Sequence, residues 1–444
     1  MTTRNGNMTG VKKLYGLPTL AACLTAFVAW AVYRSLHFPG EQALIWRVPL
    51  DLDIYRMAGQ DLVAGGLLYD APYIWELPFT YPPFAGVVFE TLAHTSNNLL
   101  IALWQGGTML ALLAVVLLVL HNRGVKLTPL TAYVAVMATA SFIALEPIHG
   151  TLFYGQINVF LMLLVSLDLI PRRRRLPGIG IGLAAGLKLT PAFLGLVLLF
   201  QKRWWAALGS VLTFAATVAV GFWLIPDAKD FWTNAMFNSS RIGDRSNGGS
   251  LDALSLMSRL YGTESRGIWL IVVAVVVALT CWAVWVAVRR DNSAAALTFT
   301  GISACVISPF SWYHHFVWVT PLAILILVAT NQFCGRLLER PLGARVGGQL
   351  AGLASFVLTA ALMIPWVAGQ VWYAGSFRNL NDWLALQPWA TLLYTGAGVL
   401  YMLVYAIYGT VRPAVRRSTA PSAPDAVVDS MADPMVDPVA DEQP

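Results

Sequence analysis

Charged side chains are scarce in this sequence: they make up 12% of its 444 residues, whereas 57% of the residues are hydrophobic. A soluble domain carries about twice that share of charge, so the composition excludes an ordinary soluble enzyme or binding module. Apolar runs of about 18 residues or more recur along the chain, and such a run is long enough to cross a bilayer as a helix. We therefore expect an all-α polytopic membrane protein that has the lipid bilayer as its solvent.

Cysteine is also rare, with four residues that fall inside or at the end of predicted spans, so no disulfide framework is visible. The first apolar run, residues 17–33, follows three basic residues like a signal peptide but lacks a small-residue cleavage site. We interpret it as an uncleaved first span. The net charge of +6 reflects basic residues in short loops, which anchor membrane topology, and we do not expect nucleic acid as a partner.

Basic residues gather in short loops, and such loops stay on the cytoplasmic side because translocation disfavours them. The basic loops lie at 123–126, 172–175, 202–203, 289–290, 336–345 and 412–417. Spans of about 20 residues then fit in about ten crossings with both termini inside. These predicted spans are 17–36, 97–120, 128–146, 155–171, 204–225, 267–288, 293–311, 315–333, 348–371 and 388–410.

Two segments do not fit this count. Residues 177–200 lie between two basic clusters, yet 24 residues cannot cross about 30 Å twice as a helix. A pair of half-helices broken at Lys188-Leu-Thr-Pro191 resolves the conflict, because a proline and a buried cation both favour an interruption that faces protein or water. Residues 82–95 are also short and are either re-entrant or one of two short crossings, which would raise the count to about twelve.

The last 32 positions, residues 413–444, are rich in Ala, Pro, Asp and Val and lack aromatic residues. Such a composition buries too little apolar surface to fold, so we expect a disordered cytoplasmic tail. Residues 1–412 then form one membrane domain.

Polar clusters outside the spans fall on one face under this topology, the extracytoplasmic one. Each cluster also has a purely structural explanation: acids in a first helical turn, interfacial aromatic rings, or hydrogen bonds between helices. Lys188 is harder to explain in this way, because intramembrane ionisable residues are costly and usually functional. The candidate site residues on this face are Asp51, Asp53, Tyr55, Tyr81, Glu146, Gln156, Asn158, Lys188, Arg241, His314 and His315.

Six motifs in order, D-L-D-I-Y, L-P-F-T-Y-P-P, E-P, Y-G-Q-I-N, G-L-K-L-T-P and S-P-F-S-W-Y-H-H-F-V-W, resemble glycosyltransferase family 87 of the GT-C type over residues 17–335. The resemblance implies a fold of about ten to twelve spans with an external catalytic face. It implies inverting transfer of mannose from polyprenyl-phosphate-mannose to a mannosylated phosphatidylinositol or lipomannan. The linkage would be α-(1→2), made at the extracytoplasmic side of the plasma membrane without a cofactor or protein partner.

The resemblance places the catalytic base on Asp51, where a carboxylate can accept the proton of an attacking hydroxyl. Asp53, two residues on, would point in another direction on a helix, so we expect it to have only a supporting role. Cationic and N–H donors around the departing phosphate would come from His315, His314, Arg241 and Lys188. We predict that only one of the two adjacent histidines faces the Asp51 cavity, since neighbours on a helix are about 100° apart. Substrate contacts are expected from Asp53, Tyr55, Tyr81, Glu146, Gln156 and Asn158.

A metal site at Asp51-Leu-Asp53 is weakly indicated, because no His, Glu or Asn stands nearby at ligand spacing, and none is expected. This chain also departs from the family pattern after Arg241-Ile-Gly243, where it reads DRSNGGSLDALS in place of an Asn-Gln pair. Acceptor contacts therefore cannot be carried over there.

Two other functions remain open from the sequence. A lipid-linked sugar flippase would also use broken helices with polar residues at depth, but it would line both leaflets with polar groups. A transferase of the same fold could instead use a polyprenyl-phosphate-arabinose donor, and no single residue identifies the sugar.

Overall fold

The computed structural model describes residues 12–37, 47–171, 177–372 and 388–412, and within those ranges the chain forms helices and no β-sheet. This confirms the all-α prediction. The predicted tail at 413–444, the basic cluster at 172–175 and residues 38–46 of the first polar loop lie outside the described residues.

The longest helices each carry at least 21 residues, and several short helices connect them. The long helices are α1 Leu17–His37, α4 Asn97–Asn122, α10 Trp204–Leu224, α13 Arg266–Arg289, α15 Val319–Trp372 and α17 Pro388–Val411. The shorter α-helices are α2 Leu50–Val63, α3 Pro83–Glu90, α5 Pro129–Ser141, α6 Glu146–Tyr154, α7 Asn158–Leu169, α8 Ile179–Leu187, α9 Gly195–Phe200, α11 Ala228–Thr233, α12 Ala253–Tyr261 and α14 Ser293–Ile307. The 3-10 turns are η1 Phe142–Ala144, η2 Thr190–Leu194, η3 Ala235–Phe237, η4 Ser239–Arg241 and η5 Tyr313–His315.

Five helices in the described ranges are long and apolar enough to cross a membrane, or six if the pair Pro129–Ala144 and Glu146–Tyr154, bent by 79°, counts as one span. The protein is therefore a multi-pass membrane protein. The other predicted spans coincide with shorter apolar helices at Leu17–Tyr33, Asn158–Leu169 and Ser293–Ile307. The predicted spans 315–333 and 348–371 both fall in α15, which is interrupted at Gly343 by a left-handed φ of 74°.

The predicted break in the segment 177–200 is present. Helix α8 ends at Leu187, Lys188 is extended with φ −155° and ψ 129°, and a 3-10 turn with Pro191 leads into α9. At the other end of α8, the fully buried Asp168 carboxylate accepts hydrogen bonds from the backbone N–H groups of Gly178 and Ile181 at 3.1 and 2.8 Å. The segment 82–95 contains only α3, whose eight residues are too short to cross a bilayer.

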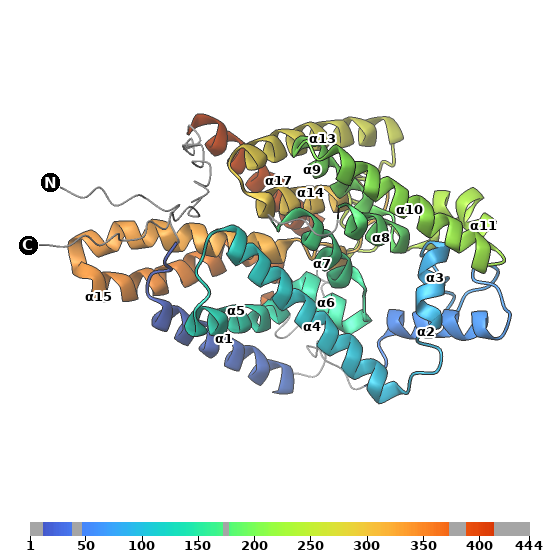
Figure 1. Cartoon of the computed structure of the whole chain (residues 1–444), viewed down its shortest axis with the longest axis horizontal. Coiled ribbons are helices and arrows are strands. Elements are labelled where there is room, and N and C mark those ends of the chain that lie inside the picture. The colour runs from blue at the N-terminus through green and yellow to red at the C-terminus, as the bar shows by residue number, and fades with distance from the viewer. Residues whose placement is uncertain (1–11, 38–46, 172–176, 373–387, 413–444) are drawn as a thin grey trace, which may run out of the picture.

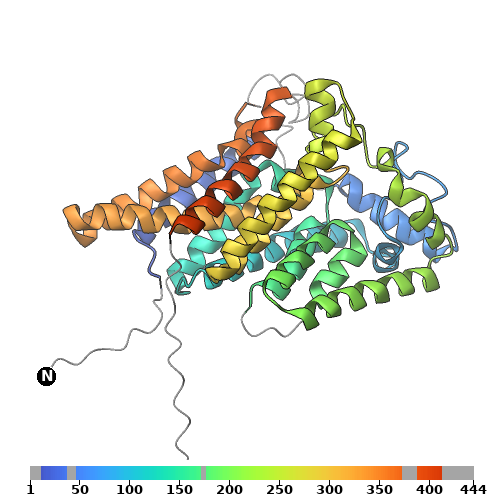
Figure 2. The ribbon, with the colours of Figure 1, turned by 90° about the horizontal axis from the view of Figure 1, so that it is seen from above.

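Two connectors that carry basic residues, 123–126 and 289–290, lie close together at one end of the molecule. The Lys12 N–H donates to Gly124 O beside Arg123, and the Ala294 N–H donates to Asn122 Oδ1. Helices α2, α3 and α11 lie at the opposite end, on the right in Figure 1, and the view from above in Figure 2 agrees. The molecule therefore has one end with basic connectors and an opposite end that holds α2.

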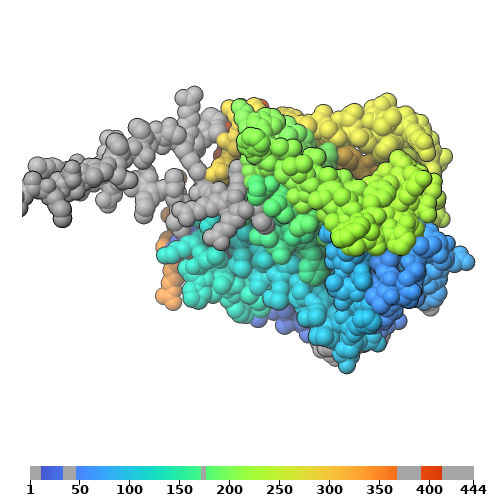
Figure 3. Space-filling view, turned by 45° about the vertical axis from the view of Figure 1, so that its right-hand side comes forward, coloured from blue at the N-terminus to red at the C-terminus, as the bar shows by residue number. Residues whose placement is uncertain are grey.

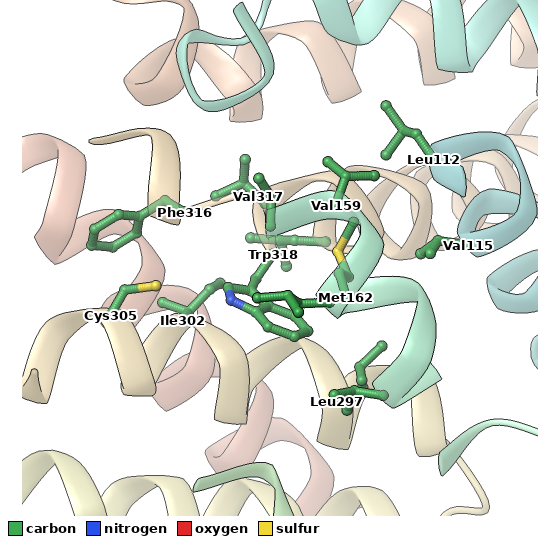
Figure 4. Packing of buried hydrophobic residues seen from close by; sticks show 14 of the residues in the cluster. Leu112, Val115, Val159, Met162, Leu297, Ile302, Cys305, Phe316, Val317 and Trp318 are labelled. Carbon is green, nitrogen blue, oxygen red and sulfur yellow. The ribbon is translucent and has the colours of Figure 1, made fainter. Parts of the chain in front are cut away.

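Side chains of α4, α7, α14 and the start of α15 form a continuous core between the two ends (Figure 4). The Trp318 indole lies next to Ile302 and Met162 in that view. A Cβ at Gly301 would come within 2.0 Å of this indole, so the glycine lets the ring lie directly on α14. This packing anchors the chain three residues after His315 and so limits where η5 can lie.

Glycines also allow α1 to lie directly against the second half of α15. A Cβ at Gly352 would come within 2.4 Å of the Gly16 carbonyl oxygen. We therefore expect Gly352→Val to push these helices apart and to lower the free energy of unfolding by about 1–3 kcal/mol, the usual cost of overpacking. Thermal unfolding of the purified protein in detergent measures this. As a control, Gly106→Ala should melt at or slightly above the wild-type temperature, because nothing lies within 4 Å of its Cβ; equal melting of both variants would contradict the packing argument.

Candidate active site

A cavity of about 750 Å³ lies at the end of the molecule that holds α2. Its walls come from α2, the loop before α3, the end of α6, the break after α8, the segment around η3 and η4, and η5. Most of the lining is apolar or aromatic, which suits a substrate that is partly lipid. Figure 3 shows the surface hollowed between the yellow region of α13 and the green region of α10 and α11.

Two acids in the first turn of α2 point in different directions. Asp51 is half-buried and lines the cavity. Asp53 does not line it and instead forms an ion pair with Arg56 at 2.6 Å. The predicted divergence of the two carboxylates is therefore present, and the expectation that Asp53 contacts substrate is not supported by the cavity lining.

The Y-G-Q-I-N motif brings α2 and α6 into contact. Helix α6 ends at Gly155, which has a left-handed φ of 72° that disfavours other residues. A Cβ there would also come within 2.8 Å of Pro49 and 2.7 Å of Leu52, so the start of α2 lies directly on this turn. The next residue, Gln156, consequently reaches Asp51 and donates a hydrogen bond from Nε2 to Oδ2.

A hydrogen-bonded chain with a single direction joins two residues of the cavity lining, Lys188 and Asp51. It passes through Asn158, which does not line the cavity, so the predicted substrate contact of Asn158 is not supported. The Lys188 ammonium donates to Asn158 Oδ1 at 3.0 Å, and Asn158 Nδ2 donates to Gln156 Oε1 at 3.3 Å. Gln156 then donates to the Asp51 carboxylate. Each amide accepts on its oxygen and donates from its nitrogen, so the chain links a cation to a carboxylate without reversing.

Two tyrosines hold this chain in place. The Tyr55 and Tyr81 hydroxyls lie 2.6 Å apart, and Tyr81 donates to Gln156 Oε1 at 3.1 Å. Tyr55 is stacked on Phe89 with ring centroids 4.3 Å apart, and Lys188 Nζ lies 5.3 Å from the centroid of the Tyr81 ring. These contacts orient the Gln156 amide, which has to present its nitrogen to Asp51.

Both histidines of the turn η5 line the cavity, so the prediction that only one would face it is wrong. The two residues lie in the single 3-10 turn 313–315, and their ring centroids are 4.9 Å apart. His315 Nδ1 accepts from the Trp312 backbone N–H at 3.2 Å, and its Nε2 lies 3.1 Å from Lys188 Nζ. The His314 ring is buried beside Tyr154, and neither of its nitrogens has a hydrogen-bond partner in the described part of the chain.

Of the candidates Arg241 and Glu146, only one lines the cavity. Arg241, in η4, is half-buried and lines the cavity. Glu146 is buried at the start of α6 and does not line the cavity, so its predicted substrate contact is not supported. Its charge instead acts on the Tyr313 hydroxyl, whose pKa is raised by burial first, then by Tyr154 and Glu146.

Sequence reasoning missed several cavity residues that lie inside the quoted motifs, among them Tyr154 and Trp312. Tyr154 precedes Gly155, and Trp312 precedes η5 and supplies the N–H that orients His315. Nothing in the residue types distinguishes such contacts from interfacial aromatic anchoring.

Burial raises the pKa of Asp51 to about 6, while the hydrogen bond from Gln156 and the charge of Lys188 lower it. Burial, with Lys188 nearby, holds the pKa values of His314 and His315 well below their usual range. At neutral pH the cavity therefore presents one moderately basic carboxylate and two neutral imidazoles. In the described part of the chain, no three His, Cys, Asp or Glu side chains converge as metal ligands.

A cavity that holds a buried carboxylate together with two imidazoles and a lysine has the groups that proton transfer and anion binding require. Comparison with known proteins identifies the class. Residues 79–309 match glycosyltransferase family 87. The chain belongs to this family and is a glycosyltransferase.

Curated relatives cover most of the chain. A polyprenol-phosphate-mannose-dependent alpha-(1-2)-phosphatidylinositol pentamannoside mannosyltransferase of Mycobacterium tuberculosis is 32% identical over 363 residues, which are 80% of this chain and 78% of the relative. The protein of that name from Mycolicibacterium smegmatis is 33% identical over 80% of this chain and 82% of its own. A phosphatidylinositol mannoside mannosyltransferase of the same organism is 33% identical over 69% and 77%. No solved structure matches the chain.

The tyrosine pair predicts a measurable coupling. Tyr81→Phe leaves the Tyr55 hydroxyl and the Gln156 oxygen each short of a buried partner, so it should lower the free energy of unfolding by about 1–2 kcal/mol. Adding Tyr55→Phe should cost less than it does alone, because the partner of its hydroxyl is already gone. Thermal unfolding of the single and double variants measures this, and strictly additive losses would show that the two hydroxyls are not coupled.

Proposed function

We propose that this glycosyltransferase transfers mannose, with inversion, from polyprenyl-phosphate-mannose to a mannosylated phosphatidylinositol or lipomannan, forming an α-(1→2) linkage. The names of the relatives support the donor, the linkage and the phosphatidylinositol mannoside acceptor. They favour mannose over arabinose, and family membership favours a transferase over a flippase. The structural observation that carries the proposal is the chain of hydrogen bonds that joins Lys188 to Asp51, both of which line the cavity.

Asp51 acts as the base in this proposal. The acceptor 2-hydroxyl attacks C1 of the donor mannose as the bond from C1 to the phosphate oxygen breaks, and the hydroxyl proton passes to the Asp51 carboxylate. The products are the α-(1→2)-mannoside and polyprenyl phosphate. A pKa near 6 suits this role, because the carboxylate is charged at neutral pH and is more basic than an exposed aspartate.

Lys188, His315 and Arg241 stabilise the departing phosphate. Because His315 Nδ1 accepts a hydrogen bond, the neutral ring carries its proton on Nε2, the nitrogen beside Lys188 Nζ. A phosphate oxygen placed against both nitrogens would accept from both donors. These interactions strengthen as charge develops on the leaving oxygen, so they lower the barrier more than they strengthen donor binding.

The cavity faces the extracytoplasmic side of the plasma membrane in this proposal. The carboxyl ends of α4 and α13, which lead into the basic connectors 123–126 and 289–290, lie at the end of the molecule opposite α2 in Figure 1, and basic loops favour the cytoplasm. The donor and acceptor lipids would then meet at the outer leaflet, where the apolar part of the cavity wall accommodates their chains.

Asp51→Asn tests the proposal directly. The amide keeps the shape of the side chain but cannot accept the proton, so mannose transfer should fall by about 10² or more while donor binding changes little. Asp53→Asn is the matched control from the same turn and should keep most of the activity. The assay is transfer of labelled mannose by purified variants to both phosphatidylinositol mannoside and pentamannoside acceptors. Near wild-type transfer by Asp51→Asn, or loss of activity in Asp53→Asn alone, would refute the assignment of the base.

The pKa of Asp51 also predicts a pH profile. The base works only when deprotonated, so kcat/KM should rise through a midpoint near pH 6 and be lost below it. Gln156→Met removes a hydrogen bond that lowers this pKa, so the midpoint should move to higher pH. Rates measured between pH 4.5 and about 8 decide the matter; a midpoint that stays in place or moves down would show that another group titrates.

A further inference from the structure

A buried carboxylate outside the cavity connects a loop to the histidine turn. Asp252 is the residue before α12 and is fully buried. Its Oδ1 accepts from the Ser255 backbone N–H at 2.9 Å and so caps the helix. Its Oδ2 accepts from the Ser255 hydroxyl at 2.7 Å and from the Ser311 backbone N–H at 3.0 Å. One carboxylate thus holds two segments that are 59 residues apart in the chain.

Backbone hydrogen bonds reinforce this connection on both sides of Ser311. The Leu251 N–H donates to Ser311 O at 2.7 Å, and the Tyr313 N–H donates to Gly249 O at 2.8 Å. The two segments therefore pair like a short piece of antiparallel ladder, with a bridge between residues 250 and 312. The carboxylate supplies the additional acceptor that the Ser311 N–H needs in this buried position.

The loop side of the pairing is itself rigid. The Arg259 guanidinium donates to the carbonyl oxygens of Arg245, Asn247 and Ser250 at 2.9, 2.8 and 2.6 Å. Three backbone acceptors on one planar donor group fix the path of this loop. Asp252 therefore connects the histidine turn to a fixed support.

The connection reaches the cavity through two adjacent backbone N–H groups. The Ser311 N–H is held by Asp252, and the N–H of the following residue, Trp312, donates to His315 Nδ1. A shift of this backbone would move the donor that orients the imidazole and selects the nitrogen that carries its proton. The other ring nitrogen, Nε2, lies 3.1 Å from Lys188 Nζ, where the phosphate is proposed to bind.

We propose that Asp252 is a positioning residue for His315: by holding the Ser311 N–H, it orients the imidazole toward the phosphate of the donor. The inference rests on the proposed role of His315 and adds a residue that never touches substrate. It predicts that the loss of Asp252 lowers turnover through His315 and through no other group.

A double-mutant cycle with a matched control tests this. In purified full-length protein, His315→Ala should lower kcat about 10²-fold, as the loss of a transition-state donor does. Asp252→Ala should lower kcat about tenfold with a smaller change in the KM for donor, since small displacements of a catalytic group are costly. In the His315→Ala background, adding Asp252→Ala should change kcat by less than about twofold, because coupled residues are not additive.

Thr128→Ala is the control for the loss of a helix cap. Thr128 caps α5 at the basic end by accepting from the Thr131 backbone N–H at 3.2 Å, and it has no connection to the cavity. It should lower the melting temperature, though less than Asp252→Ala, which also leaves the Ser311 N–H without its carboxylate acceptor, and it should leave kcat within about twofold of wild type. Asp252→Asn, which keeps one carbonyl oxygen for the cap, replaces Asp252→Ala in the cycle if the alanine variant does not fold.

The outcomes separate this inference from the proposed function. If Asp252→Ala reduces kcat by the same factor with and without His315, or no more than Thr128→Ala does, Asp252 is only structural and the inference fails while mannose transfer stands. If His315→Ala itself turns over at the wild-type rate, both the inference and the phosphate role of His315 fail, and Asp51→Asn remains the independent test of the transferase.

Discussion

The site is organised around one costly group, the ammonium of Lys188 inside a membrane protein. A cation out of water needs partners, and Lys188 finds an amide oxygen on Asn158 and the ring face of Tyr81. The break in the helix contributes as well, because Lys188 stands at the carboxyl end of α8, where the helix dipole favours a positive charge. The break, the Y-G-Q-I-N turn and η5 all converge on this position, so the cation explains why three motifs that are distant in sequence form one wall.

Some of this arrangement could be predicted from the sequence, because it depends on local chemistry. A lysine followed by Thr190 and Pro191 in an apolar segment predicts an interruption wherever the segment lies, and the helix breaks there. Asp51 and Asp53 had to diverge once they were placed on a helix, since two residues subtend about 200°. The long apolar helices follow equally directly from composition.

Other features depend on packing that one segment does not reveal. Glu146 belongs to a quoted motif, yet it is buried at the start of α6, directly after the 79° bend, and does not line the cavity. Both histidines line the cavity with their ring centroids 4.9 Å apart, although the angle between neighbours on a helix predicted only one. The contact between Asp252 and Ser311 joins residues 59 positions apart, and no periodicity or motif in the sequence predicts it. Such tertiary contacts require the fold to be known before the residues can be interpreted.

The charge of Lys188 affects the basicity of Asp51 during the proposed reaction. Lys188 is one of the two influences that lower the pKa of Asp51, so its charge makes the carboxylate less basic than burial alone would. The phosphate of a bound donor would offset the charge of Lys188, and the lowering of the Asp51 pKa by that charge would diminish. Asp51 would then become more basic once a donor is in place and a proton has to be accepted. The same lysine that binds the leaving group thus adjusts the base through electrostatics alone, without any movement of the chain.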